Sequence, residues 1–152
     1  MRSRGLTRAW FVLMVSGFAE IGALPPFIPL ETRTREADVV IVGEVVEVLS
    51  HRTGETTRAA MIRVLVMEEL KGRVGLPQLT VHFVVFPGSY ENHLRSPPAR
   101  GKYFLFLQKE EVKDAAGKAG MAFVLYRPHP FSFAPVTAEN RSKVEAGLRG
   151  IK

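Results

Sequence analysis

Histidines are the side chains best suited to chemistry in this sequence, because imidazole titrates near neutral pH and is a common metal ligand. The separations between them match no local metal-binding spacing such as His-Glu-x-x-His. One of them alternates with apolar neighbours, as a residue on the face of a sheet does. The histidines therefore predict no metal site. The four are His51, His82, His93 and His129.

Other catalytic patterns are absent from the sequence. Gly88-Ser89-Tyr90 is nearest to the Gly-x-Ser-x-Gly elbow of hydrolases, but it lacks the second glycine and a following helix, which indicates a turn. The carboxylate pairs Glu68-Glu69 and Glu110-Glu111 are adjacent residues, which point to opposite faces of an extended chain. We therefore predict no catalytic residue and no cofactor.

A surface of aromatic and basic side chains is the remaining candidate site. It combines the long irregular stretch 87–101 with the end of the last predicted strand, and it would bind extended polyanions or sugars by stacking and charge. The alternative is a solvated loop with ordinary charges. The sequence leaves open whether the two segments are neighbours. The candidate ligand contacts are Tyr90, His93, Arg95, Arg100, Arg127 and His129.

Composition indicates one globular domain that is stabilised by packing alone. The chain has 152 residues, of which 46% are hydrophobic and 24% charged. It has no cysteine, which excludes a disulfide framework, a thiolate zinc site and a cysteine nucleophile. The net charge of +6 falls to about +3 without the arginines of the first eight residues, so nucleic acid is a weak expectation as a partner.

Residues 1–23 have the order of a signal peptide: a basic start, an apolar run from Ala9 to Ala19, and small residues suited to cleavage after Ala19 or Ala23. A membrane anchor is the first alternative, because the apolar sequence continues to Leu30. A buried helix of a cytoplasmic protein is the second. Glu20 and the prolines that follow it interrupt the run, which favours cleavage. We expect a periplasmic or extracellular protein.

The mature chain divides into a spacer, a strand-rich body and a helix. Residues 24–36 form a Pro-rich spacer and a short helix at 30–36. A connection at 68–77 begins with one helical turn. Thr137 caps a helix over 137–152, in which Val144, Leu148 and Ile151 form an apolar stripe and two glycines weaken the end. Strands are expected at 38–49, with a bulge or bend at Gly43, and at 59–67, 79–86, 102–108 and 121–127.

Five short strands without long crossover helices favour an antiparallel sheet. Such a sheet must close or cover its edges. We therefore predict an all-β fold over residues 37–136, a five-stranded OB-like β-barrel of the partly open type that binds oligonucleotides and oligosaccharides, with the C-terminal helix packed on it. A small two-sheet β-sandwich is the alternative.

Three blocks of the sequence carry a resemblance when taken together: residues 37–45, 69–72 and 101–107. They resemble a group of poorly characterised bacterial exported proteins, whose domain is similar to the netrin-like module and to the N-terminal domain of tissue inhibitors of metalloproteinases. The resemblance covers residues 37 to 127 and implies the same barrel class. It implies no activity, because those inhibitors place an N-terminal cysteine on the protease zinc and this chain has no cysteine.

The sequence thus favours an exported, non-enzymatic binding module, with another envelope or extracellular protein or a polysaccharide as partner. Contact with a membrane is expected only through an uncleaved leader. One alternative is an OB-type nucleic-acid or oligosaccharide binder, although export counts against nucleic acid. The other is a hydrolase, which requires His93 or His129 to lie beside a carboxylate and a hydroxyl.

Overall fold

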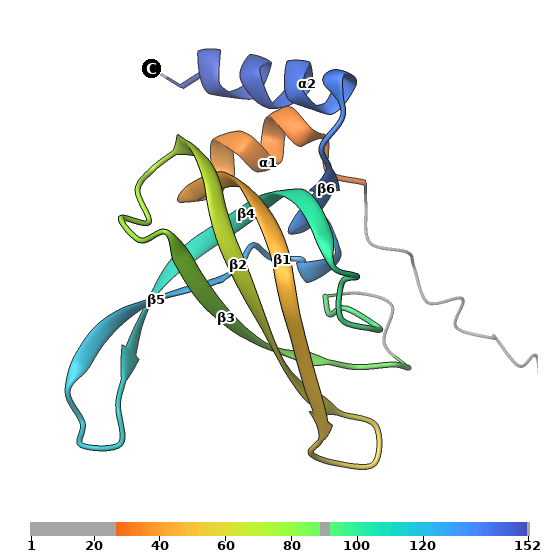
Figure 1. The fold of residues 1–152 in the computed structure, drawn as a ribbon, viewed down its shortest axis with the longest axis vertical. Coiled ribbons are helices and arrows are strands. Elements are labelled where there is room, and N and C mark those ends of the chain that lie inside the picture. The colour runs from red at the N-terminus through yellow and green to blue at the C-terminus, as the bar shows by residue number, and fades with distance from the viewer. Residues whose placement is uncertain (1–26, 89–91, 152) are drawn as a thin grey trace, which may run out of the picture.

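A computed structural model describes residues 27–88 and 92–151, in which strands are the main secondary structure and one helix lies at each end (Figure 1). The signal peptide expected at residues 1–23 lies outside the described residues. The elements are α1 (Leu30–Glu36), β1 (Val39–Arg52), β2 (Arg58–Lys71), β3 (Gln78–Val85), β4 (Gly101–Lys113), β5 (Ala119–Leu125), the 3-10 turn η1 (His129–Phe131), β6 (Phe133–Pro135) and α2 (Ala138–Arg149).

The strands form one antiparallel sheet in the order β3-β2-β1-β4-β5, and β6 also pairs with β4. The prediction of a mostly β, antiparallel fold is confirmed. The expected barrel closure is wrong, because β3 and β5 approach each other without pairing. The β4–β5 hairpin projects away from the body instead (Figure 1). The sandwich alternative is wrong as well, since every strand between residues 27 and 151 that the structure describes belongs to this sheet.

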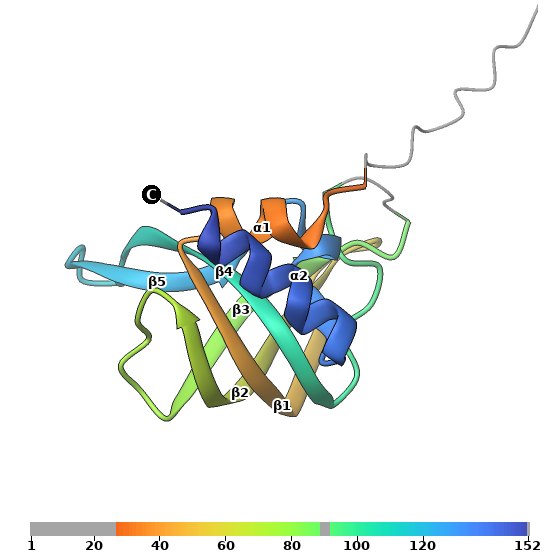
Figure 2. The ribbon, with the colours of Figure 1, turned by 90° about the horizontal axis from the view of Figure 1, so that it is seen from above.

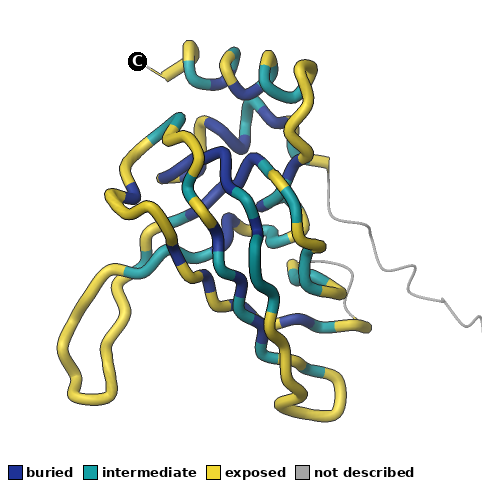
Figure 3. Tube along the Cα trace, in the orientation of Figure 1, coloured by how far each residue is buried: buried dark blue, intermediate teal, exposed yellow. Residues whose placement is uncertain are grey.

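Both faces of the sheet are buried at 39–42 of β1 and 104–107 of β4, which explains why the two strands are apolar at consecutive positions there. Val39 and Ile41 of β1 lie in a core enclosed by the curl of the sheet, together with the inward side chains of β2 and β3. Val40 and Val42 lie in a second core under the two helices. The buried residues lie in the first halves of these two strands, and the hairpin tips are exposed (Figure 3).

Helices α1 and α2 lie side by side over the second core (Figure 2). A Cβ atom added to Gly147 of α2 would lie 2.7 Å from Thr34 Cβ and 2.8 Å from the Glu31 carbonyl oxygen of α1. Gly147 therefore permits a close approach of the two helices, whereas the sequence presented it as a weak point. Val144 and Leu148 pack into the second core as predicted. Ile151 follows the helix and is exposed, so the predicted stripe ends before it.

Local predictions agree with the structure where backbone chemistry determines them. Strand register shifts between Val42 and Gly43, which confirms the bulge. The Thr137 hydroxyl accepts a hydrogen bond of 3.1 Å from the Asn140 N–H, which confirms the helix cap. The helical turn expected after residue 67 is wrong, because β2 stays paired with β1 up to Lys71. The sixth strand, β6, was not predicted.

Lys71 ties the end of β2 to the C-terminus of α1. Its ammonium donates hydrogen bonds to the carbonyl oxygens of Thr34 at 3.1 Å and Arg35 at 2.7 Å, and also to that of Ala37. These carbonyls lie at the negative end of the helix, where a cation is favourable. Burial lowers the pKa of the Lys71 ammonium from its ordinary value.

Candidate functional site

Two histidines that the sequence proposed from separate segments are neighbours in the structure. The ring centroids of His93 and His129 lie 5.3 Å apart, with the rings nearly perpendicular. The ring centroids of Phe86 and His93 lie 4.4 Å apart. The backbone N–H of His129 donates a hydrogen bond of 3.0 Å to the carbonyl oxygen of Asn92. The loop before β4 and the segment after β5 therefore meet, a point that the sequence left open.

This histidine pair has a neutral member. Burial is the main cause that lowers the pKa of His129 to about 4. Electrostatic repulsion from His93 and from the Arg127 cation acts in the same direction. The Nδ1 atoms of both rings are buried without a hydrogen-bond partner. Neither ring makes a hydrogen bond to a carboxylate or a hydroxyl within residues 27–88 and 92–151, so the described part of the chain supplies no catalytic arrangement around them.

The remaining predicted ligand contacts do not converge on a cavity. Arg127 is exposed, and its guanidinium lies 3.3 Å from a carboxylate oxygen of Glu110. Arg95 and Arg100 are exposed on the loop before β4. Tyr90 lies outside the described residues. The structure therefore brings His93 and His129 together, and it puts Arg95, Arg100 and Arg127 on the surface.

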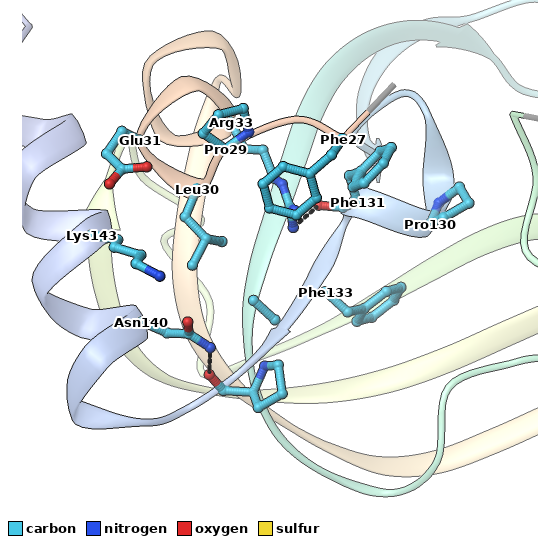
Figure 4. A pocket seen from close by; sticks show the side chains of 12 residues that line it. Phe27, Pro29, Leu30, Glu31, Arg33, Pro130, Phe131, Phe133, Asn140 and Lys143 are labelled. Atoms are coloured by element: carbon cyan, nitrogen blue, oxygen red, sulfur yellow. Dashed lines mark hydrogen bonds between the residues drawn. The ribbon is translucent and has the colours of Figure 1, made fainter. Parts of the chain in front are cut away.

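A second candidate site lies elsewhere and was not found from the sequence. It is a cavity of about 510 Å³ between the start of α1, the η1–β6 segment and the first half of α2 (Figure 4). Ligand pockets in proteins have this size and are lined mainly by apolar side chains with a few polar groups. Its lining includes Phe27, Leu30, Arg33, Phe131, Phe133 and Lys143.

Arg33 is the unusual member of this cavity wall, since it is only 6% exposed. Its guanidinium carbon lies 4.7 Å from the ring centroid of Phe131 and 5.7 Å from that of Phe27. Its Nε donates to the Ile28 carbonyl at 2.7 Å, and its Nη1 to the Phe131 carbonyl at 3.4 Å. Burial lowers the pKa of the Arg33 guanidinium. The cation is thus held by carbonyls and aromatic faces.

Two other polar side chains of the cavity wall, those of Lys143 and Asn140, already have partners. Lys143 Nζ lies 2.5 Å from Glu139 Oε1, one helical turn earlier in α2. The side-chain amide of Asn140 donates to the Pro135 carbonyl at 2.9 Å. Glu31 is the acidic side chain among the lining residues. The wall is therefore mainly apolar, with Arg33 as its one deeply buried charge among the residues that the structure describes.

Comparison with known proteins adds no relative. The chain matches no protein-family model, and no curated protein is similar to it. None of the helices in the described segments is long and apolar enough to cross a lipid bilayer. The function must therefore be inferred from the chemistry of the cavity and from the sequence.

Proposed function

We propose that the protein is an exported, non-enzymatic binding module, and that its ligand site is the cavity between α1, β6 and α2. The apolar cavity with a buried arginine in its wall is the observation that carries this proposal. Export rests on the order of basic, apolar and small residues in the first 23 positions. The module belongs to the OB-like class that the three sequence blocks imply, with its sheet left open.

The proposed partner is another envelope or extracellular protein. Strand β6 contributes residues to the cavity wall and pairs with β4, and its other edge has no strand partner among the described residues. An extended polypeptide can add to such an edge with its main chain while a side chain fills the adjoining pocket. A nucleic acid would require a basic surface with stacking rings rather than one buried cation.

Site-specific photocrosslinking tests this proposal in the full chain. A benzoylphenylalanine in place of Phe27 puts the reactive group at the rim of the cavity, where the native ring is already 77% exposed. The same residue in place of Met121, which is 65% exposed on β5, is the matched control. We expect a discrete adduct with another protein from position 27 and none from position 121. Adducts of equal yield, or no adduct from position 27, would contradict the proposal.

A further inference from the structure

The buried arginine of the cavity wall has no carboxylate partner. Three other arginines, Arg63, Arg127 and Arg141, each contact a glutamate although they are far more exposed than Arg33. Within residues 27–88 and 92–151, no acidic group lies within 4.0 Å of the Arg33 guanidinium. A charge removed from water is costly unless an opposite charge compensates it, so this position is suited to an anion supplied from outside.

Arg33 also retains hydrogen-bonding capacity. A guanidinium has five N–H donors, and the contacts with Ile28 and Phe131 use two of them. The guanidinium carbon lies over the rings of Phe27 and Phe131, and the remaining N–H donors are left for a planar acceptor (Figure 4). A carboxylate is planar and accepts two parallel hydrogen bonds from such an edge.

The rest of the cavity is suited to an apolar side chain. Leu30 and Phe133 line it, and their side chains have no charge to offer a ligand. Lys143, the second cation of the wall, is already paired with Glu139, and its side chain is only partly buried. The ligand charge therefore belongs at Arg33, and the apolar part of the ligand belongs beside Phe133.

Building on the proposed function, we propose that the cavity binds an acidic–apolar segment of a partner polypeptide, with its carboxylate on Arg33 and a large apolar side chain between Leu30 and Phe133. In an extended chain, side chains two positions apart lie on the same face. The segment therefore has an aspartate or glutamate two residues from a phenylalanine or leucine. The open edge of β6 favours a polypeptide over a free fatty acid with the same charge.

Two capped peptides of equal shape test this inference in the full chain. The probes are acetyl-Glu-Ala-Phe-amide and acetyl-Gln-Ala-Phe-amide, titrated into isotopically labelled protein and followed by amide chemical shifts. We expect the glutamate peptide to bind at least tenfold more tightly and to shift the signals of Arg33 and Phe131. Replacing Arg33 by methionine keeps the apolar stem and should remove the tenfold preference. Arg35→Met, at an exposed position of the same helix, should retain it.

The outcomes separate the two proposals. Equal binding of both peptides at the cavity overturns the assignment of a carboxylate to Arg33 and leaves the binding module standing. Binding of neither peptide, together with no crosslink from position 27, overturns the cavity as a ligand site. The comparison between the two peptides uses the unsubstituted protein, so it decides the question even if Arg33→Met fails to fold.

Discussion

Replacing Gly147 by alanine tests the packing of the two terminal helices. In an exposed helix this change stabilises a protein by about 1 kcal/mol, because glycine has the greater backbone freedom in the unfolded chain. Here the new methyl carbon would lie 2.7 Å from Thr34 Cβ, 2.8 Å from the Glu31 carbonyl oxygen and 3.0 Å from Glu31 Cα. Two of these three atoms belong to the backbone, so a change of side-chain rotamer cannot relieve the contact.

The helices must therefore separate by a few tenths of an ångström or more, which loosens the core around Val144. Overpacking of this kind costs about 1–3 kcal/mol, and the contacts with backbone atoms favour the upper half of that range. After the gain in helix propensity, we expect Gly147→Ala to lower the free energy of unfolding by about 1–2 kcal/mol. The corresponding fall in Tm is roughly 4 °C per kcal/mol for a domain of this size.

Gly150→Ala is the matched control. Gly150 ends the same helix with a φ of −79°, and its added Cβ would meet nothing closer than 3.5 Å. It should be neutral or slightly stabilising. Urea denaturation followed by circular dichroism measures both variants. If Gly147→Ala were as stable as the unsubstituted protein, or more stable, the tight α1–α2 contact would be refuted.

Three further predictions concern stability. Lys71→Met removes the cation from three carbonyls of α1 and should cost about 1–2 kcal/mol in a urea titration, whereas Lys113→Met, at the exposed end of β4, should change it by less than about 0.5 kcal/mol. Thr137→Ala should cost about 1 kcal/mol and Thr137→Ser very little, since serine keeps the cap; equal losses would contradict the capping role. The pKa of His129 lies near 4 in the folded chain against 6.5 in the unfolded one, so the unfolded chain binds more protons between these values and stability should fall as pH decreases from 6.5 to 4. The loss is roughly 1–2 kcal/mol, because the ring is partly exposed, and thermal melts of His129→Gln should show a weaker pH dependence.

The features of the fold that were predictable depend on short-range patterns. The apolar run of β1, the bulge at Gly43 and the cap at Thr137 each follow from local backbone chemistry. The arrangement of the sheet edges does not follow from local backbone chemistry. Strand β6 has three residues and ends in proline, so it has no period to detect. Barrel closure depends on how β3 and β5 meet across the molecule, which no local pattern encodes.

The candidate site divides in the same way. His93 and His129 were recognisable as chemically capable residues, but their contact arises from segments 36 positions apart. The cavity joins residues near the start of α1 to residues about 100 positions later, and a charged residue in a short helix gives no sign that it is buried. The one sequence signal for a buried site is the cluster of phenylalanines and prolines at 128–135, because an exposed loop does not need so many apolar side chains. That signal does not point to Arg33 itself.

The packing of α1 on α2 also has a consequence for how the chain acquires its structure. The second core is incomplete until Val144 arrives, and that residue comes after all the strands. A nascent chain therefore leaves its first helix and the outer faces of β1 and β4 uncovered until α2 has been synthesised. Such a delay leaves the second core unclosed while the strands are being made, and it makes α2 the element that completes the fold.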